Sequence, residues 1–478
     1  MIKTKIVATL GPTSSDKEII RAIIESGARV IRINFSHGTH DEHRERIAAV
    51  REITNELKIA VAVLVDLCGP KIRTGETEKP MHLNSGDKFI LTTRNDYNFS
   101  ANEMPLSYKD LPQYLKKGER ILFDDGNFEA VVDHVDGTDI HLTATITAPL
   151  GSRKGINVPG VELPISAITE KDEKDLRFAL NEDIDWVAMS FVRSAKDINT
   201  VKDIMADEGV FRPIMAKIEQ REAIQNIDEI ISAYDAVMVA RGDMGVEMSI
   251  EQVPTLQKEI IKKANAAGKP VVTATQMLDS MIRNPRPTRA EATDVTNAIL
   301  DGTDAVMLSG ETAAGNYPIE AVKTMAILAE LAEDIFHQRG QGFCIECMDE
   351  SQKGVLDITV ADSAVAIAMK LGAKAIIAAG SDSYTATLVS KSRPNQTVIA
   401  ATSDFSNFNQ MSVLWGVLPY YIKTPGTMNE DLDRAVRFGV QNGIVENGDL
   451  VVIVKMINQP LGIVTRGGNQ IRLAYVDL

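Results

Sequence analysis

Short apolar segments recur along the first two thirds of the chain, and polar residues able to bind a metal or a phosphate stand at the ends of several of them. Four of these segments are RVIRINF, AVAVLVDL, RPIMAKIE and AVMVARGD. Amphipathic stretches of helical spacing separate them, which indicates βαβ units and a parallel sheet. About eight such units predict an α/β fold with a closed (β/α)₈ (TIM) barrel. Because the loops at the carboxyl ends of barrel strands converge, the pattern predicts an enzyme.

The third barrel unit is interrupted by a long segment without a convincing helical pattern. Strand-like pieces in it, among them DKFILTT and FEAVVDHVDG, alternate in polarity and are separated by D-G and N-D turns. We therefore predict a barrel over residues 1–69 and 161–338, with a small inserted β-barrel domain at 70–160. Its place at the active-site end of a strand is typical of a lid, although an inert insertion is the alternative.

A third domain is expected after the barrel. The polar, glycine-rich stretch at residues 339–353 predicts a linker, and residues 354–478 alternate strand and helix patterns as in an open α/β sheet of about five strands. The loop GSDSYT carries Ser381, Ser383 and Thr385 before a predicted helix. Backbone amides there could bind the phosphate of an effector, and an ordinary N-capped turn is equally compatible with the pattern.

The composition excludes several classes of protein. The formal net charge of −15 argues against nucleic acid as the main partner, since phosphate-backbone binding depends on basic patches. No apolar run approaches the length of a membrane span, so we expect a soluble, cytoplasmic protein. The three cysteines do not indicate a disulfide framework. Cys344 and Cys347 form a single C-x-x-C, for which two free thiols are a better interpretation than a zinc site.

Charged residues at three strand ends suggest phosphoryl chemistry. Glu219 and Asp243 end adjacent predicted strands, and two carboxylates completed by water and substrate oxygens are how Mg²⁺ is usually held. Solvated or ion-paired acids are the alternative. Lys217 shares the strand face of Glu219, so its ammonium could stabilise a transferring phosphoryl group and an enolate. Arg32, on one face with Asn34, is suited to binding a phosphate.

Backbone groups add a possible anion site. Gly242 precedes Asp243, and Gly245 is expected in a turn leading into the helical segment SIEQVPTLQKEI. Amides exposed at such a helix start would bind a carboxylate. Neither G-x-x-x-x-G-K-[ST] nor G-x-G-x-x-G occurs in a suitable context, so a nucleotide would have to be bound by another device.

Together these segments resemble the pyruvate kinase family over the whole chain. The most specific part is residues 269–313, KPVVTATQMLDSMIRNPRPTRAEATDVTNAILDGTDAVMLSGETA, followed by AKIEQREAI, VARGDMGVE, RINFSHG and GSRKGINVPG. The resemblance implies phosphoryl transfer from phosphoenolpyruvate to ADP, giving pyruvate and ATP in the last step of glycolysis. It also implies Mg²⁺, with Mn²⁺ as an alternative, a homotetramer and a mobile lid. A phosphorylated allosteric effector is a further possibility.

The resemblance also implies roles for individual residues. The catalytic residues would be Arg32, Lys217 and Thr275. The substrate would contact Arg32, Ser190, Lys217, Gly242, Asp243 and Thr275. The nucleotide phosphates would be reached by Asn34, His37, Arg73 and Lys154. Glu219 and Asp243 would hold the divalent metal. Thr275 with a water would relay the proton to the enolate carbon, supported by Ser309 and Glu311.

One departure from the family pattern concerns potassium. Many members read LDTKGPEIRTG where this chain reads VDLCGPKIRTG, which places Leu67, Cys68 and Lys71 at positions of Thr, Lys and Glu. In such members K⁺ uses side chains like those of Asn34, Ser36 and Asp66 together with the Thr. The fixed ammonium of Lys71 could replace the mobile cation, so we predict activity without K⁺. The role of Cys68 stays open.

Two alternatives remain at this level. Another enzyme of phosphoenolpyruvate or a related enolate, such as a phosphotransferase or an aldolase, could use a similar barrel. A catalytically inactive sensor or scaffold is the second alternative, although such a protein would be expected to have lost Lys217 or a metal carboxylate. The third domain and the TATQMLDSM segment favour the kinase.

Overall fold

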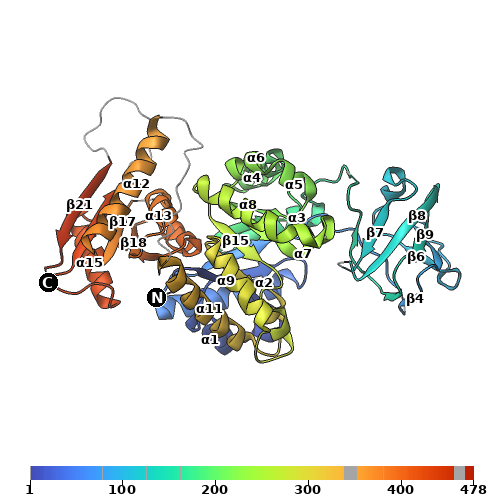
Figure 1. Cartoon of the computed structure of the whole chain (residues 1–478), viewed down its shortest axis with the longest axis horizontal. Coiled ribbons are helices and arrows are strands. Elements are labelled where there is room, and N and C mark those ends of the chain that lie inside the picture. Colours follow the sequence, from blue (N-terminus) through green and yellow to red (C-terminus); the bar gives the residue numbers. More distant parts are fainter. Residues whose placement is uncertain are drawn as a thin grey trace.

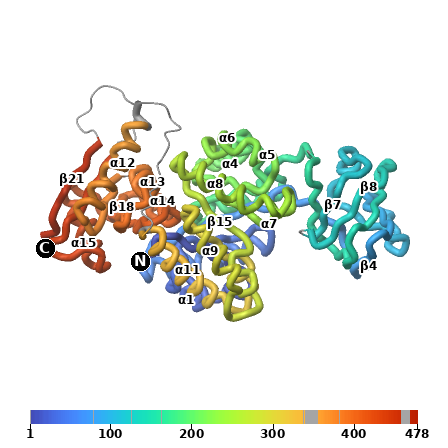
Figure 2. Tube along the Cα trace, viewed as in Figure 1, coloured from blue at the N-terminus to red at the C-terminus, as the bar shows by residue number. Residues whose placement is uncertain are grey.

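The computed structural model has a barrel in the middle, the inserted domain at one end and the third domain at the other (Figures 1 and 2). It describes residues 2–77, 79–124, 126–161, 163–338, 352–380, 382–456 and 469–477. Cys344 and Cys347 and most of the predicted linker lie outside these ranges. The division of the chain at residues 69/70, 160/161, 338/339 and 353/354 stays a prediction.

Eight parallel strands close the central barrel, which confirms the predicted (β/α)₈ fold. In spatial order these are β1 (Lys5–Leu10), β16 (Ala305–Leu308), β15 (Val271–Ala274), β14 (Ala236–Ala240), β13 (Ile214–Ile218), β12 (Trp186–Met189), β3 (Ala62–Asp66) and β2 (Ala28–Asn34). Their residues are mostly buried, as expected where helices cover the outside of a parallel sheet and side chains fill its interior.

Helices surround the barrel strands (Figure 1). They are α1 (Lys17–Glu25), α2 (His40–Leu57), α3 (Glu170–Leu180), α4 (Ile198–Glu208), α5 (Arg221–Gln225), α6 (Ile227–Ala233), α7 (Arg241–Glu247), α8 (Val253–Ala266), α9 (Arg289–Leu300), α10 (Gly310–Ala313) and α11 (Pro318–Gln338). Capping boxes led by Thr39, Thr169 and Thr288 begin α2, α3 and α9. Each threonine satisfies a backbone N–H that a helix start would otherwise leave unpaired.

The inserted segment is built mainly of β-strands, as predicted, with two short 3₁₀ helices, η2 (Phe99–Ala101) and η3 (Leu111–Tyr114). Its strands are β4 (Met81–Leu83), β5 (Lys88–Thr92), β6 (Glu103–Pro105), β7 (Arg120–Phe123), β8 (Phe128–Asp136), β9 (Asp139–Ala144), β10 (Ala148–Leu150) and β11 (Ile156–Asn157). They form a six-stranded sheet and a two-stranded sheet. Phe89, Phe123 and Phe128 contact one another in the core. The insertion was predicted as a small β-barrel, and its strands form two sheets that pair separately.

The third domain is an open five-stranded sheet, also as predicted. Its strand order is β19 (Val417–Tyr421), β18 (Thr397–Thr402), β17 (Ala375–Ala379), β20 (Leu450–Lys455) and β21 (Gln470–Tyr475), with β21 antiparallel. Its helices are α12 (Gln352–Leu371), α13 (Tyr384–Lys391), α14 (Phe405–Gln410) and α15 (Met428–Gln441). Within the described residues, no helix is both long and apolar enough to cross a membrane.

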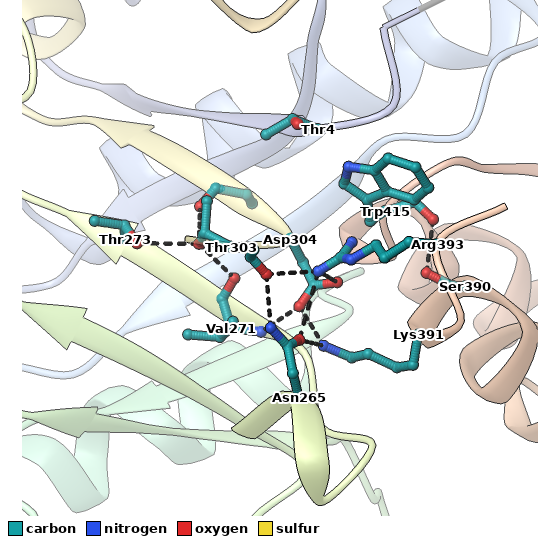
Figure 3. Close-up of polar contacts among 12 residues, drawn as sticks. Thr4, Asn265, Val271, Thr273, Thr303, Asp304, Ser390, Lys391, Arg393 and Trp415 are labelled. Carbon is teal, nitrogen blue, oxygen red and sulfur yellow. Dashed lines mark hydrogen bonds and ion pairs between the residues drawn. The ribbon is translucent and has the colours of Figure 1, made fainter. Parts of the chain in front are cut away.

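A buried ion-pair cluster joins the third domain to the barrel (Figure 3). Asp304, just before β16, lies 2.5 Å from the Lys391 ammonium and 3.1 Å from the Arg393 guanidinium. Lys391 also donates to the Asn265 side chain at 2.8 Å. The guanidinium of Arg393 lies over the Trp415 ring, 4.8 Å from its centroid. Because the three charged side chains are buried, each depends on the others for compensation.

A second buried lysine at this boundary predicts a pH effect on stability. Lys5 donates to the Val417 carbonyl at 2.7 Å. Burial lowers the pKa of Lys5 from its ordinary value of 10.5 to about 7, with Arg29 acting in the same direction and Glu333 opposing. Between these values the unfolded chain binds the proton more tightly than the folded one, so the free energy of unfolding should rise with pH.

We therefore expect the midpoint of the first urea transition to increase between about pH 7 and about pH 9. The contribution of Lys5 to the slope is at most about 1.4 kcal/mol per pH unit. Lys5→Met should have a flatter profile, measured by intrinsic fluorescence across the same buffers. Parallel profiles for the two proteins would contradict the assignment to Lys5.

Candidate active site at the carboxyl ends of the barrel strands

Arg32, Asp66 and Lys217 meet at the carboxyl ends of β2, β3 and β13. The Arg32 Nε donates to Asp66 Oδ2 at 2.7 Å, and the Lys217 Nζ lies 3.4 Å from Asp66 Oδ1. A further Arg32 nitrogen donates to the Thr9 hydroxyl at 3.1 Å. Asp66 is buried, so this carboxylate fixes two cations beside each other at the mouth of the barrel.

Lys217 contacts Ser190 and Glu219 in addition to Asp66. Its ammonium donates to the Ser190 hydroxyl at 2.6 Å and lies 3.7 Å from Glu219 Oε2. Ser190 in turn donates to the Leu67 carbonyl at 2.7 Å. The strand spacing predicted that the Lys217 and Glu219 side chains lie on one face of β13. Their ion pair confirms that prediction.

Glu219 has an oxygen available for a ligand. Its Oε1 accepts from the Phe191 N–H at 2.7 Å, whereas the buried Oε2 has no hydrogen-bond partner among the described residues. A buried carboxylate oxygen without a donor is costly unless a cation binds it. No group of three or more His, Cys, Asp and Glu side chains suited to a metal occurs in the described part of the chain, so a metal here would need oxygens from substrate and water.

The charges determine which of these groups are ionised. Burial opposes ionisation of Asp66, but Lys217 and Arg32 outweigh it and hold the pKa of Asp66 below its usual value. Burial would also lower the pKa of Lys217, yet Asp66 and Glu219 raise it overall. Burial raises the pKa of Glu219 to about 7, against the attraction of Lys217 and with the help of Asp243. A divalent cation would favour the ionised form of Glu219.

Gly242 and Thr275 contact each other across the tops of two strands. The Gly242 N–H donates to the Thr275 hydroxyl at 2.8 Å. Thr275 has φ 67° and the following Gln276 has φ 53°, a left-handed conformation that is costly for a β-branched residue. The neighbouring Arg241 donates to the carbonyls of Ala274 and Thr275. The strained segment is thus held firmly in place.

The expected turn at Gly245 is wrong in detail. Helix α7 begins directly after β14 and runs through Gly242, Asp243 and Gly245 before a separate helix, α8, starts at Val253. Glycine weakens a helix but does not forbid it. Gly242 and Gly245 are therefore accommodated within α7. Asp243 consequently stands in the first turn of α7.

The residues predicted to reach the nucleotide phosphates lie at two places. Lys154 and Arg73 are at the root of the inserted domain, where the backbones of Arg73 and Gly155 form a bridge. The Lys154 ammonium lies 2.9 Å from Asp124. Asn34 and His37 are on the barrel. Burial lowers the pKa of His37, and Arg73 is the strongest of the nearby cations that lower it further.

Lys71 and Leu67 differ in their surroundings. The Leu67 side chain is buried in the barrel core, where it offers no oxygen ligand. The Lys71 side chain lies against Gly155. A Cβ atom at position 155 would be only 2.9 Å from Lys71 Cε, so glycine leaves the space that the lysine side chain occupies. Asn34 Oδ1 accepts from the Ser36 N–H at 3.1 Å.

The loop predicted to bind an effector is only partly described, because Ser381 lies outside the described residues. Ser383 is the N-cap position of α13, but its side chain makes no capping hydrogen bond. Thr385 is buried, and its hydroxyl accepts from the Met456 N–H at 3.3 Å. Of the two interpretations of this loop, the contact of Asp382 with the Tyr384 N–H at 3.2 Å favours an ordinary capped turn.

Sequence reasoning missed three contributors to the site. The Phe191 N–H reaches Glu219 because Phe191 has φ 55°, and nothing in the sequence marks that conformation. Thr9 could have been found, since it lies near the carboxyl end of β1 as Arg32 does in β2. Arg241 directly precedes Gly242, and it pairs with Asp294 at 2.7 Å.

Comparison with known proteins assigns the chain to a family. Residues 1–322 match the pyruvate kinase barrel domain, and residues 359–463 match the pyruvate kinase alpha/beta domain. Pyruvate kinase of Clostridium acetobutylicum is 45% identical over 95% of this chain and 96% of its own length. Pyruvate kinase of Staphylococcus aureus strain MRSA252 is 43% identical over 95% of this chain and 77% of its own length. The chain therefore belongs to the pyruvate kinase family and is a phosphotransferase.

Proposed function

We propose that this chain transfers the phosphoryl group of phosphoenolpyruvate to ADP with Mg²⁺ and without a requirement for K⁺. The observation that carries the proposal is the cluster of Arg32, Asp66, Lys217 and Glu219 at the mouth of the barrel. Two cations and a carboxylate oxygen that lacks a hydrogen-bond partner among the described residues match the needs of phosphoryl transfer, which depends on positioning and charge stabilisation.

Glu219 and Asp243 would hold the divalent cation. The orphaned Oε2 of Glu219 fits such a role, and Asp243 is close enough to Glu219 to raise the pKa of that carboxyl. Bound Mg²⁺, or Mn²⁺ in its place, would neutralise charge on the substrate oxygens. The remaining positions would be filled by substrate and water, consistent with only two protein carboxylates.

Lys217 and Arg32 would bind the phosphoryl group. Asp66 keeps both side chains charged and oriented before the substrate arrives, so little reorganisation is required during transfer. Lys217 would stabilise the enolate oxygen as well. The hydroxyl of Ser190, which contacts Lys217 at 2.6 Å, would keep the ammonium pointing at the substrate.

The substrate carboxylate would bind between α7 and the Thr275 loop. Gly242 and Asp243 stand in the first turn of α7. The Gly242 N–H, which donates to the Thr275 hydroxyl at 2.8 Å, would exchange that acceptor for the substrate carboxylate. We propose that Thr275 with a water relays a proton to the enolate carbon. Ser309 and Glu311 stand near this loop, where Glu311 accepts from the Leu278 N–H at 3.0 Å.

The nucleotide phosphates would be bound by residues of both the barrel and the inserted domain. Asn34 and His37 approach from the barrel, while Arg73 and Lys154 approach from the root of the inserted domain. Arg73 already lies near enough to His37 to lower its pKa, and closure of the inserted domain as a lid would bring Lys154 towards them and exclude water. Lys154 would exchange its contact with Asp124 for a phosphate.

Independence from K⁺ is supported by the surroundings of Asp66 and Leu67. Both carboxylate oxygens of Asp66 already face fixed cations, Arg32 and Lys217. The Leu67 side chain supplies no oxygen where related proteins have a threonine, and its backbone carbonyl already accepts from the Ser190 hydroxyl. Asn34 and Ser36 remain from the potassium site of those proteins. We propose that Lys71 supplies the missing charge once the inserted domain closes.

Two further proposals rest on family membership alone. The chain would assemble as a homotetramer, and a phosphorylated effector would bind near the loop of Ser383 and Thr385. Neither is needed for the chemistry proposed above. The function itself is tested by coupling pyruvate formation from phosphoenolpyruvate and ADP to NADH oxidation, with Mg²⁺ and with EDTA. Absence of pyruvate at saturating substrates and Mg²⁺ would contradict it.

Removing the metal carboxylate is expected to separate metal binding from folding. Glu219→Gln should lower the affinity for Mn²⁺ by about 10-fold to 100-fold and reduce pyruvate formation accordingly, because a neutral amide binds a hard cation weakly. Electron paramagnetic resonance of free Mn²⁺ measures the affinity without turnover. Glu222→Gln, nearby on α5, is the matched control and should bind Mn²⁺ as the parent does. Equal Mn²⁺ affinity in Glu219→Gln would exclude Glu219 as a ligand.

A further inference from the structure

Lys171, in the first turn of α3, contacts the segment that follows β2. Its ammonium donates to the Phe35 backbone carbonyl at 2.7 Å. Phe35 lies between Asn34 and His37, the two barrel residues proposed to reach the nucleotide phosphates. The Phe35 N–H donates to the Asp66 carbonyl at 3.0 Å. The backbone of Phe35 is therefore held on both sides, by β3 and by α3.

The side chain of Phe35 also packs against α3. It is buried and stacks on the His43 ring, with the two centroids 4.2 Å apart. The ring of Phe178, on α3, lies 6.2 Å from that of Phe35 and stacks on His40 at 4.1 Å. Such ring pairs prefer defined geometries. The position of the segment after β2 therefore depends on α3 through both ring packing and the Lys171 hydrogen bond.

A buried carboxylate orients the Lys171 ammonium. Asp175 Oδ2 lies 2.5 Å from Lys171 Nζ, and Asp175 Oδ1 lies 2.8 Å from His40 Nε2. Asp175 is buried, whereas the Lys171 side chain is 57% exposed. An exposed lysine without such a partner would sample many rotamers. Asp175 therefore directs a flexible side chain at the Phe35 carbonyl.

The next residue of α3 contacts the loop after β3. The buried Asp172 accepts from the Gly69 N–H at 3.0 Å through Oδ1 and from the Thr169 N–H at 3.0 Å through Oδ2. The Gly69 carbonyl accepts from the Lys71 N–H at 2.9 Å. Helix α3 is the first α-helix after the inserted domain. Adjacent residues in its first turn thus connect the two loops that flank the proposed nucleotide site.

We propose that Lys171 is a positioning residue for the nucleotide, which holds the Phe35 carbonyl so that Asn34 and His37 face the phosphates of ADP. This inference rests on the proposed function. Burial is the largest cause of the lowered pKa of His37, and Lys171 is among the nearby cations that lower it further, so the ammonium lies close to this segment. Binding is sensitive to small displacements of such groups, because a well-placed contact requires no reordering when the ligand arrives.

Isothermal titration with ADP and Mg²⁺ tests this role without turnover. Lys171→Met should weaken ADP binding by about tenfold, the effect of losing one hydrogen bond from a charged donor. In steady-state assays the KM for ADP should rise by a similar factor, while kcat and the KM for phosphoenolpyruvate stay within about threefold of the parent. Lys171→Arg should recover most of the affinity, because a guanidinium can donate to both the Phe35 carbonyl and Asp175.

Two further variants of α3 separate positioning from a general effect of charge. Lys174→Met removes an exposed lysine from the same helix and should bind ADP as the parent does. Asp175→Asn removes the carboxylate that orients Lys171 and should weaken ADP binding by about threefold or more. A direct contact between Lys171 and the phosphates predicts the opposite, since Asp175→Asn would free the ammonium. Tighter ADP binding by that variant would therefore overturn the positioning role.

The remaining outcomes distinguish this inference from the proposed function. Unchanged ADP affinity in Lys171→Met, or an equal loss in Lys174→Met, would overturn the inference, while pyruvate formation by the parent would still support the function. A parent that binds ADP without forming pyruvate would contradict the function, and the titrations would still decide the role of Lys171. A parent that does not bind ADP would overturn both. Circular dichroism establishes that each variant is folded.

Discussion

Replacing Lys217 with methionine is expected to reduce kcat for pyruvate formation by about 10³-fold. The Lys217 ammonium lies within 4 Å of both Asp66 and Glu219, and under the proposed function it would stabilise charge on the transferring phosphoryl group and the enolate. A preorganised charge of this kind acts mainly in the transition state. The KM for phosphoenolpyruvate should therefore change much less than kcat.

Steady-state assays of pyruvate formation from phosphoenolpyruvate and ADP with Mg²⁺ give kcat and KM for the parent and the variant. Circular dichroism establishes that the variant is folded. Lys262→Met removes an exposed lysine from α8 and should leave kcat unchanged. A loss in Lys217→Met confined to KM would indicate that Lys217 binds substrate without stabilising the transition state. Activity within threefold of the parent would exclude Lys217 from the chemistry.

Asp304→Asn is expected to destabilise the fold by about 3–5 kcal/mol. The substitution leaves the buried Lys391 and Arg393 without their carboxylate, which lies 2.5 Å and 3.1 Å from them. Asp304 also accepts from the Val271 N–H at 2.7 Å, so it fixes the start of β15. The lowest urea transition should move to lower denaturant, measured by fluorescence.

A double variant separates charge from packing. Adding Lys391→Met to Asp304→Asn removes one uncompensated charge and should recover part of the lost stability, so the two effects will not add. The exposed pair of Lys17 and Glu52 is the control, where Glu52→Gln should cost less than about 1 kcal/mol. Equal costs for Asp304→Asn and Glu52→Gln would show that the buried cluster does not hold the two domains together.

The fold was predictable because strand and helix periods differ along the chain. Eight buried apolar segments separated by amphipathic ones specify a closed parallel barrel, and the alternation in the insertion specifies antiparallel strands. The two-sheet arrangement of the insertion was not predictable, because the pairing of β4 with β10 depends on contacts between residues far apart in sequence. Helix α12 was not predicted individually. Residues 352–371 are apolar on more than one face, so they lack the one-sided pattern that marks an amphipathic helix.

The site was predictable where it follows from the alternation of side chains between the two faces of a strand. Lys217 and Glu219 are two residues apart and face the same space, and Arg32 and Asp66 end paired strands β2 and β3. The remaining geometry depends on backbone conformation. A positive φ at Phe191 or Thr275 has no sequence signal, because neither residue type favours it. The hydrogen bonds from Arg241 to the carbonyls of Ala274 and Thr275 likewise form only when the barrel folds, and the sequence carries no signal for them.

The most direct test of the proposed function is the rate of pyruvate formation from phosphoenolpyruvate, ADP and Mg²⁺ in tetramethylammonium buffer, with and without K⁺ at constant ionic strength. The double variant Leu67→Thr, Lys71→Glu is measured beside the parent. We expect equal, substantial rates for the parent in both buffers and a strong K⁺ requirement in the variant. A parent rate that rises at least about tenfold on adding K⁺, equivalent to about 1.4 kcal/mol, would contradict the assignment of Lys71 as the internal cation.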